Sequence, residues 1–377
     1  MRTGTLLASF AALAAAAPST QSHPESTSHP LVVDQAPDTP RPYVLPKGFG
    51  RAVSVGSQVY RFSVTGNASD GAFTLLQTNA PSSPGLGVLP HIHKAHYENF
   101  YCTKGQFRLW AESNSSAQQG RQLTPGDYGA VPHNTKHTFQ VLDPDTQMTG
   151  VIHPGGFEEL FVALGDDFSS NTGTPFVPAA LNDSSSGTDP KVITTLESFD
   201  VFAQLDFEPR QDFINGQAGG SSQWHNDRNT LAIDSTTPNF IAKNRGPKYL
   251  NNIGGTYQLI APLATKSQTN SNFTMGTVTL SHQTDGTRSI KTKLREPVAF
   301  QLEEGKLSIV IKGYEVVELI QGDVVFVPGN TVFTYHAVVP FTKFLYVSGG
   351  KDGFDQTLLK GAKAWDYASY PVAYTVS

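Results

Sequence analysis

Four side chains in the first half of the chain are of the types that bind transition metals. His91 and His93 stand two residues apart, Glu98 follows five residues later, and His137 lies beyond a further segment. Imidazole and carboxylate ligands together suit a divalent first-row metal ion, and they can leave coordination positions open for a substrate. A lone His-x-His pair is more often ordinary polar surface or core, but the complete set of four predicts a metal centre.

The spacing of these residues indicates which elements must carry them. Residues two apart in a strand point to the same side, so the first two histidines share a face. In an unbroken strand Glu98 would point away from them, so the chain must bulge or turn across residues 94–97. Phe100 and Phe139 follow Glu98 and His137 by two residues and should line the same cavity as the metal. The predicted pocket is therefore aromatic and apolar, with one polar end.

The two segments that hold these residues resemble the cupin family of small β-barrels. The first segment matches the cupin pattern Gly-x5-His-x-His-x4-Glu-x6-Gly at every fixed position, from Gly85 to Gly105. The second segment matches at three further positions, Gly126, Pro132 and His137. It departs from the usual pattern at Asn134, where glycine is expected, and at Val141, where asparagine often occurs. Both departures concern turn geometry rather than ligation, so the resemblance still implies a metal-binding barrel.

A weaker copy of the same pattern occurs in the second half of the chain. Four of its residues correspond to fixed positions or pocket positions of the first copy, namely Phe300, Gly305, Gly322 and Pro328. On this register the four ligand positions are taken by Lys291, Lys293, Val298 and Phe333. Two ammonium groups repel a cation and two hydrocarbon side chains cannot bind one. The second barrel is therefore predicted to be metal-free.

Length and composition agree with two barrels. The chain has 377 residues, 34 glycines and 25 prolines, and its β-branched runs and few long helical periods favour two mostly β domains. We predict an all-β bicupin with two jelly-roll β-barrel domains joined by a linker, with a few short helices, one of them at 157–164. The expected boundaries are a signal peptide at 1–17 with cleavage between 17 and 25, an N-terminal metal-binding cupin at 26–168, a linker at 169–230 and a C-terminal metal-free cupin at 231–377.

The N-terminus and the surface motifs predict a secreted, extracellular protein. Arg2 precedes an apolar run that ends near Ala17, which is typical of a secretory signal and too short to span a bilayer. Four acceptor motifs for N-glycosylation occur, at Asn67, Asn114, Asn182 and Asn272. The one cysteine, Cys102, excludes an intrachain disulfide and should be a buried thiol. A net charge of −5 makes nucleic acids and anionic membranes unsuitable partners.

Beyond these motifs the chain resembles the fungal quercetin 2,3-dioxygenases (flavonol 2,4-dioxygenases), a bicupin family, over nearly all of its mature length. The resemblance rests on runs such as Arg41-Pro-Tyr-Val, His96-Tyr-Glu-Asn-Phe-Tyr-Cys, Pro154-Gly-Gly-Phe and Gly246-Pro-Lys-Tyr-Leu-Asn. It implies one Cu²⁺ per chain, held in the N-terminal barrel by His91, His93, Glu98 and His137, although this ligand set also suits other divalent first-row metals. It further implies an enzyme that uses dioxygen to open the central ring of a flavonol, giving a depside and carbon monoxide.

The same resemblance implies which residues surround the substrate. Six positions fall where the family packs the flavonol beside the metal: Tyr60, Thr78, Phe100, Phe139, Met148 and Phe157. Glu98 is expected to act as general base as well as ligand, because a carboxylate beside the metal can accept the proton of a coordinated hydroxyl. A homodimer is a further expectation, since large barrels with apolar outer faces often pair.

Two other functions stay open at this point. An oxalate-metabolising cupin shares the same ligand set, but its small anionic substrate would need an arginine and small polar walls, whereas Phe100 and Phe139 flank the ligands here. A binding or storage cupin without catalysis is the other alternative. Such proteins commonly lose ligands, whereas the N-terminal barrel keeps all four.

Overall fold

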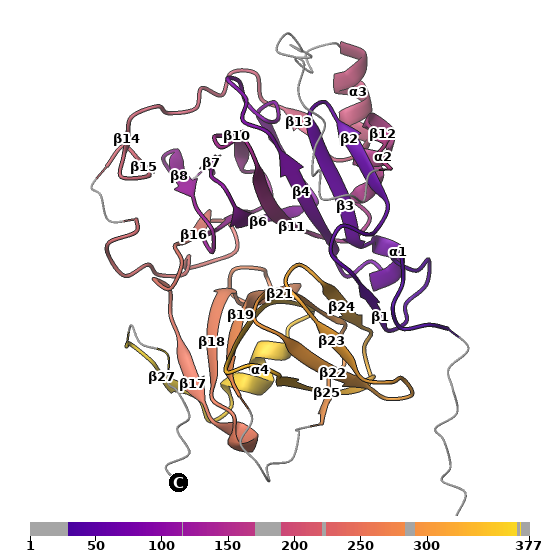
Figure 1. Cartoon of the computed structure of the whole chain (residues 1–377). Coiled ribbons are helices and arrows are strands. Elements are labelled where there is room, and N and C mark those ends of the chain that lie inside the picture. The colour runs from indigo at the N-terminus through magenta and orange to yellow at the C-terminus, as the bar shows by residue number, and fades with distance from the viewer. Residues whose placement is uncertain are drawn as a thin grey trace, which may run out of the picture.

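The computed structural model describes residues 29–114, 116–169, 190–220, 224–282, 291–367 and 370. The predicted signal peptide and the glycosylation motif at Asn182 lie outside these residues. Figure 1 shows two packed β-barrels, the N-terminal one mostly in purple at the top and the C-terminal one mostly in orange below it. The mostly β, two-barrel fold class predicted from the sequence is confirmed.

The N-terminal barrel consists of two antiparallel sheets. In spatial order, its eight-stranded sheet contains β12 (Asp166–Asp167), β2 (Ala52–Val55), β3 (Gln58–Val64), β4 (Thr74–Ala80), β11 (Thr146–His153), β6 (Tyr97–Lys104), β9 (Tyr128–Val131) and β16 (Asn239–Ile241). Its seven-stranded sheet contains β13 (Phe202–Ala203), β5 (His91–Ile92), β10 (Lys136–Val141), β7 (Phe107–Glu112), β8 (Gln119–Leu123), β15 (Gln217–Ala218) and β14 (Phe213–Ile214). The strands β13, β14 and β15 come from the segment predicted as a linker.

The C-terminal barrel has the same plan with a smaller second sheet. Its eight-stranded sheet contains β1 (Tyr43–Leu45), β24 (Val324–Val327), β21 (Val298–Glu304), β26 (Phe341–Gly349), β19 (Phe273–Ser281), β18 (Gln258–Ala264), β17 (Tyr249–Asn251) and β27 (Lys363–Ala364). Its four-stranded sheet contains β20 (Thr292–Lys293), β25 (Val332–Ala337), β22 (Leu307–Ile311) and β23 (Val317–Leu319).

The helices of the described residues are short and lie outside the sheets. They are α1 (Gly66–Ser69), α2 (Glu158–Leu164), α3 (Pro190–Ser198), α4 (Phe354–Leu359) and a 3₁₀ turn (Ile253–Gly255). The helix predicted at 157–164 is confirmed as α2, with Phe157 at its N-cap position. In the described part of the chain no helix is long and apolar enough to cross a membrane.

The two barrels exchange a strand in a nearly symmetric way. β1, from the start of the chain, pairs with β24 of the C-terminal barrel, and β16, from the second half, pairs with β9 of the N-terminal barrel. After each exchanged strand a backbone amide donates to a buried aspartate: Lys47 to Asp323 over 2.9 Å and Lys243 to Asp127 over 2.7 Å. Each barrel is thus closed by a strand that belongs to the other half of the sequence.

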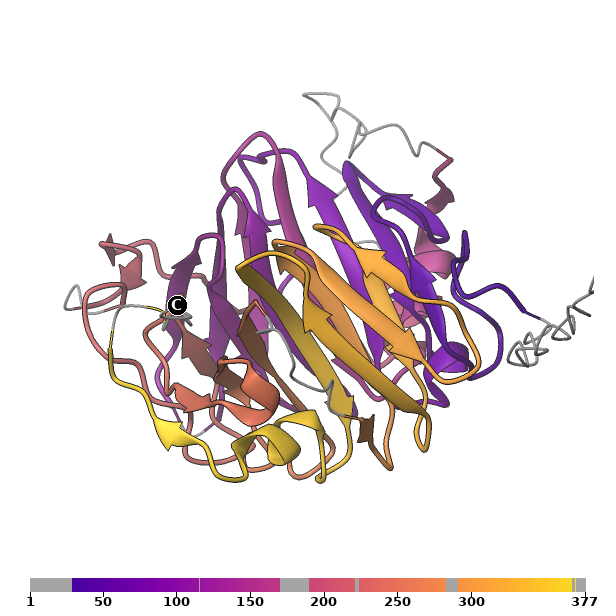
Figure 2. The ribbon, with the colours of Figure 1, turned by 60° about the horizontal axis from the view of Figure 1, so that its bottom comes forward.

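The eight-stranded sheets of the two barrels pack against each other. One apolar cluster draws residues from both, including Tyr101 and Tyr128 on one side and Phe326 on the other. At the centre of the contact the Gln301 side chain donates to the Thr149 hydroxyl over 2.8 Å. Figure 2 shows the orange strands in front of the purple ones. The barrels therefore share a core and do not form independent bodies on a flexible tether.

The structure corrects one detail of the predicted register in the C-terminal barrel. Opposite Phe333 stands Thr292, just as His91 stands opposite His137 in the N-terminal barrel. Lys291 and Lys293, which were placed at ligand positions, are exposed instead. The sequence alignment was wrong by one residue here because the turn that leads to β21 is one residue shorter than its N-terminal counterpart. The inward positions are held by Thr292, Leu294, Val298 and Phe333, which still offer no metal-binding set.

Candidate metal centre

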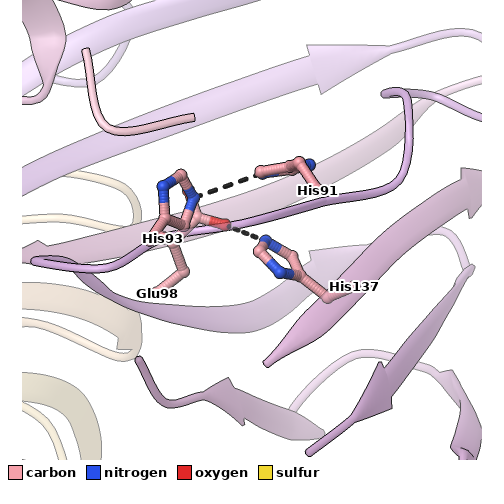
Figure 3. A group of neighbouring side chains, drawn as sticks. All are labelled: His91, His93, Glu98 and His137. Carbon is pink, nitrogen blue, oxygen red and sulfur yellow. Dashed lines mark hydrogen bonds and ion pairs between the residues drawn. The ribbon is translucent and has the colours of Figure 1, made fainter. Parts of the chain in front are cut away.

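The four predicted ligands come together inside the N-terminal barrel, from both of its sheets. His91 lies in β5 and His137 directly opposite it in β10, so both belong to the seven-stranded sheet. His93 follows β5, and Glu98 reaches in from β6 of the eight-stranded sheet. One donor atom from each residue lies within 4.8 Å of all the others. Figure 3 shows the three rings and the carboxylate facing one shared point.

The turn required by the spacing is present. β5 ends at Ile92 and β6 begins at Tyr97, and the intervening residues leave strand conformation. Because of this turn, the chain passes from one sheet to the other between His93 and Glu98. Asn134, which replaces the usual glycine, has a φ of 55° in the left-handed region, which asparagine tolerates better than most residues. The departure from the cupin pattern therefore preserves the turn.

Each imidazole is held in a defined orientation by a backbone carbonyl. The Nδ1 atoms lie close to carbonyl oxygens: His91 to Leu89 at 2.8 Å, His93 to Asp200 at 2.8 Å and His137 to Thr135 at 2.9 Å. Because a carbonyl only accepts, each Nδ1 carries the hydrogen and each Nε2 presents its lone pair to the shared point. Such fixing of the ring tautomer by an outer partner is typical of metal-binding histidines.

The distances between the donor atoms fit a metal ion. Nε2 of His91 lies 3.2 Å from Nε2 of His93, and Nε2 of His137 lies 3.0 Å from a carboxylate oxygen of Glu98. Ligands about 2.0–2.1 Å from a tetrahedral ion stand roughly 3.3 Å apart. Two imidazole lone pairs that face each other this closely repel unless a proton or a metal ion lies between them. The residues therefore fit a bound cation.

The pKa shifts of the cluster also indicate a site suited to a cation. Burial, together with the neighbouring His137 and His93 rings, holds the pKa of His91 well below its ordinary value. Burial would raise the pKa of Glu98, but His93 and His137 outweigh it, and that pKa lies well below its ordinary value. Burial would lower the pKa of His93, but the Glu98 carboxylate outweighs it and raises that pKa. An ionised carboxylate beside imidazole lone pairs is an environment that favours a cation.

The six residues expected around the substrate are all buried in the N-terminal half of the structure. The set is Tyr60, Thr78, Phe100, Phe139, Met148 and Phe157. Tyr60, Thr78 and Met148 stand opposite one another on β3, β4 and β11. The rings of Phe100 and Phe139, from the two sheets, lie 6.2 Å apart and are tilted by 55°, and Phe157 meets the His93 ring edge-on at 5.1 Å. Their part in substrate binding stays a prediction.

Asp200 is a residue of this region that sequence reasoning did not single out. Its backbone carbonyl accepts from the His93 ring, and its carboxylate accepts from the His96 ring over 2.8 Å. It lies in the segment predicted as a linker, and no motif or periodicity marks it. His133 and His153 lie outside the cluster: His133 packs on the Tyr97 ring at 3.8 Å, and His153 donates to a backbone carbonyl. Cys102 is fully buried, as predicted.

Comparison with known proteins adds the family. No family model matches the chain. It is 49% identical over 345 residues to quercetin 2,3-dioxygenase of Aspergillus japonicus, covering 90% of this chain and 98% of that protein. The chain belongs to the quercetin 2,3-dioxygenase family. This confirms the family resemblance and the enzyme class predicted from the sequence.

Two more distant similarities complete the comparison. The quercetin 2,3-dioxygenase of Bacillus subtilis (strain 168) is 36% identical over 147 residues, which cover 39% of this chain and 41% of that protein. Among solved structures, the formate complex of Lactobacillus farciminis oxalate decarboxylase matches with a TM-score of 0.47 and 14% identity, covering 82% of this chain and 87% of that one. The latter likeness is too low to bear on activity, so the functional argument rests on the quercetin 2,3-dioxygenase family and on the site.

Proposed function

We propose that this protein is a secreted, copper-dependent dioxygenase that cleaves the central ring of quercetin and related flavonols with O₂, giving a depside and carbon monoxide. The observation that carries the proposal is the convergence of three imidazoles and Glu98 inside an aromatic barrel, in a chain that aligns with a quercetin 2,3-dioxygenase over almost its whole length. An oxalate-metabolising cupin would share the ligand set, but the alignment favours the flavonol-cleaving activity over both oxalate chemistry and plain binding.

The residues that would hold the copper are His91, His93, Glu98 and His137. A mixed imidazole and carboxylate set accepts Cu²⁺, which leads the affinity order of divalent first-row metals. When bound, copper would acidify a coordinated hydroxyl and accept an electron from the substrate. Because the three rings are neutral donors and Glu98 carries one negative charge, these ligands would leave the centre with a single positive charge. Such a centre suits an anionic flavonolate.

Glu98 is the residue placed to move the proton. Its two carboxylate oxygens lie 3.0 Å from the His137 ring and 3.5 Å from the His93 ring, so a hydroxyl that enters the same point also comes within its reach. We infer that Glu98 accepts the proton of the flavonol 3-hydroxyl and holds it while the ring opens. A positioned general base contributes about 10²- to 10⁴-fold to a rate.

The apolar walls would hold the flat substrate and exclude water. Phe100 and Phe139 belong to opposite sheets, with ring centroids 6.2 Å apart and ring planes tilted by 55°, so they offer an apolar contact surface to a planar ring system. Gly87 has no room for a side chain, because a Cβ there would lie 2.3 Å from the Phe139 ring. Burial and the charge of Glu98 raise the pKa of the Tyr60 phenol above its ordinary value, so Tyr60 stays protonated and able to donate a hydrogen bond.

One experiment tests the activity directly. Purified protein of known metal content is incubated with quercetin in air, while the loss of flavonol absorbance and the release of carbon monoxide are followed. We expect stoichiometric carbon monoxide with about one copper per chain. Copper without carbon monoxide would reject the ring-cleaving activity, and absence of any bound metal would favour a binding protein. Oxalate, offered in parallel, should not be consumed.

We further propose secretion after cleavage between residues 17 and 25, with glycans at Asn67, Asn114, Asn182 and Asn272. Asn67 and Asn114 are exposed and Asn272 is partly exposed. N-terminal sequencing of the secreted protein and its mass before and after glycan removal test both points.

A homodimer is part of the same proposal. Sedimentation at several concentrations tests it, and a monomer throughout would reject it.

A further inference from the structure

A short segment that lies between the two barrels in the sequence packs on the N-terminal barrel and contacts the predicted ligand His93. Residues 199–204, called the strap below, follow α3 and lie beside the ligand strand β5. β13 within the strap pairs with β5, with Ala203 opposite His91, and the amide of Gln204 donates to Pro90 over 2.7 Å. Leu196 and Val201 are buried in the same apolar cluster as Tyr60 and Phe157. The strap is therefore part of the barrel wall.

Asp200 is the residue through which the strap reaches the ligands. Its Oδ1 accepts from the amide of Lys94 over 2.9 Å, and its Oδ2 accepts from the amides of Ala95 and His96 over 2.8 and 3.0 Å. The His96 ring donates to the same Oδ2 over 2.8 Å. These amides belong to the turn that joins the histidine strand to the glutamate strand. One carboxylate thus holds the whole turn.

The backbone of Asp200 holds a ligand as well. Its carbonyl accepts from Nδ1 of His93 over 2.8 Å, across a separation of 107 residues. The other two histidines differ, because their Nδ1 atoms bond to carbonyls only two residues away in the sequence, at Leu89 and Thr135. Their orientation follows from their own chain segments. The orientation of His93 instead depends on a distant segment that must be docked.

The geometry points to Asp200 as a positioning residue of the metal centre: its backbone carbonyl sets the tautomer and orientation of His93, and its carboxylate fixes the turn before Glu98. This inference rests on the metal-binding part of the proposed function. On this inference the strap supports the metal ligand His93, and a segment outside the ligand strands contributes to metal affinity. Loss of an outer partner of a metal ligand typically weakens affinity roughly 10- to 100-fold.

The conformation of Asp200 defines the test variants. Its φ of 65° lies in the left-handed region, where glycine and asparagine fit and alanine is strained. Asp200→Gly removes the carboxylate and keeps the backbone path, whereas Asp200→Asn keeps one accepting oxygen. Glu197→Gln is the matched control, because Glu197 is exposed, lies three residues away and loses the same charge.

The first readout is the dissociation constant of Cu²⁺, measured by competition with a chelator. We expect Asp200→Gly to bind roughly 10- to 100-fold more weakly, Asp200→Asn to fall between, and Glu197→Gln to match the wild type. The electron paramagnetic resonance spectrum of bound Cu²⁺ should change in Asp200→Gly, because the carbonyl that accepts from the His93 ring is no longer anchored by the carboxylate's hydrogen bonds to the turn. A merely structural role would lower stability without altering that spectrum.

The second readout uses the metal-free protein and separates this inference from the proposed function. We expect amide hydrogen exchange at Lys94, Ala95 and His96 to accelerate in Asp200→Gly, and the Nδ1–H signal of His93 to broaden or shift by nuclear magnetic resonance. If the wild type binds no copper, the copper proposal fails, while these measurements still decide the positioning role. Unchanged exchange and an unchanged His93 signal would overturn the inference, as would unchanged copper affinity with an unchanged spectrum. If Asp200→Gly does not fold, the same comparisons are made with Asp200→Asn.

Discussion

The two barrels share a backbone frame but differ in what their interiors hold. In the N-terminal barrel the backbone N–H of Asn134 donates to the backbone carbonyl of His93 over 2.6 Å. In the C-terminal barrel the backbone N–H of Asn330 donates to the backbone carbonyl of Leu294 over 2.7 Å. Both asparagines are in the left-handed region, with φ values of 55° and 63°. The same turn is therefore built in both barrels, but it contacts a predicted metal ligand, His93, only in the N-terminal barrel.

The difference lies in a few inward positions and in one turn. His93 and Glu98 are separated by five positions in the sequence, whereas their counterparts Leu294 and Val298 are separated by four. The longer turn provides the amides that Asp200 holds. The shorter turn leads into a strand whose Phe300 ring packs at 4.7 to 5.9 Å against its aromatic neighbours. The same frame is thus built around a metal-binding set of side chains in one barrel and around an apolar core in the other.

The strongest test of this comparison replaces His137 and Phe333, which occupy equivalent strand positions in the two barrels, by alanine in separate variants. We expect His137→Ala to lose copper and turnover, because it removes a ligand. Phe333→Ala should keep copper and lower the free energy of unfolding by about 3–5 kcal/mol, because it opens a cavity in a packed core. Metal analysis, carbon monoxide release and denaturant unfolding measure these effects. Loss of copper from Phe333→Ala alone would contradict the separation of roles.

The next test concerns the base. Glu98→Gln should keep part of the copper and lose about 10²- to 10⁴-fold in kcat, because the amide cannot accept the proton. Glu304→Gln, an exposed glutamate of the C-terminal barrel, serves as the control and should leave kcat unchanged. Single-turnover kinetics on metal-analysed protein measure the effect. A Glu98→Gln enzyme with full turnover per copper would remove the base assignment.

A smaller effect is expected from pH at the contact between the barrels. Burial raises the pKa of Glu303 to about 7, despite a hydrogen bond from Gln301. The folded state then binds a proton more tightly than the unfolded state between pH 4.5 and about 7, so stability should fall as pH rises through that window. The loss is at most roughly 3 kcal/mol. Denaturant unfolding of the wild type and of Glu303→Gln at pH 5 and 7.5 measures it; the variant should lack this dependence.

Much of this architecture could be predicted from local sequence patterns. Alternation put His91 and His93 on one face, and their spacing from Glu98 required the turn that the structure contains. The role of Asp200 could not be predicted, because its contact with His93 joins residues 107 apart and leaves no periodic trace. The exchanged strands β1 and β16 were missed for the same reason, since three residues carry too little pattern to indicate a distant partner. The register at Thr292 was missed because equal turn lengths were assumed.

The smallest predicted effect compares the two asparagines of the shared turn. Asn134→Ala and Asn330→Ala should each lower the free energy of unfolding by about 1–2 kcal/mol, because alanine is strained in the left-handed region, whereas the corresponding glycine variants should change it by a few tenths of a kcal/mol. Denaturant unfolding of the metal-free variants measures these differences. Copper affinity should fall only for Asn134→Ala, because strain at residue 134 displaces the backbone N–H that donates to the carbonyl of His93. A similar fall in copper affinity for Asn330→Ala would mean that the metal centre also depends on the conformation of the C-terminal barrel.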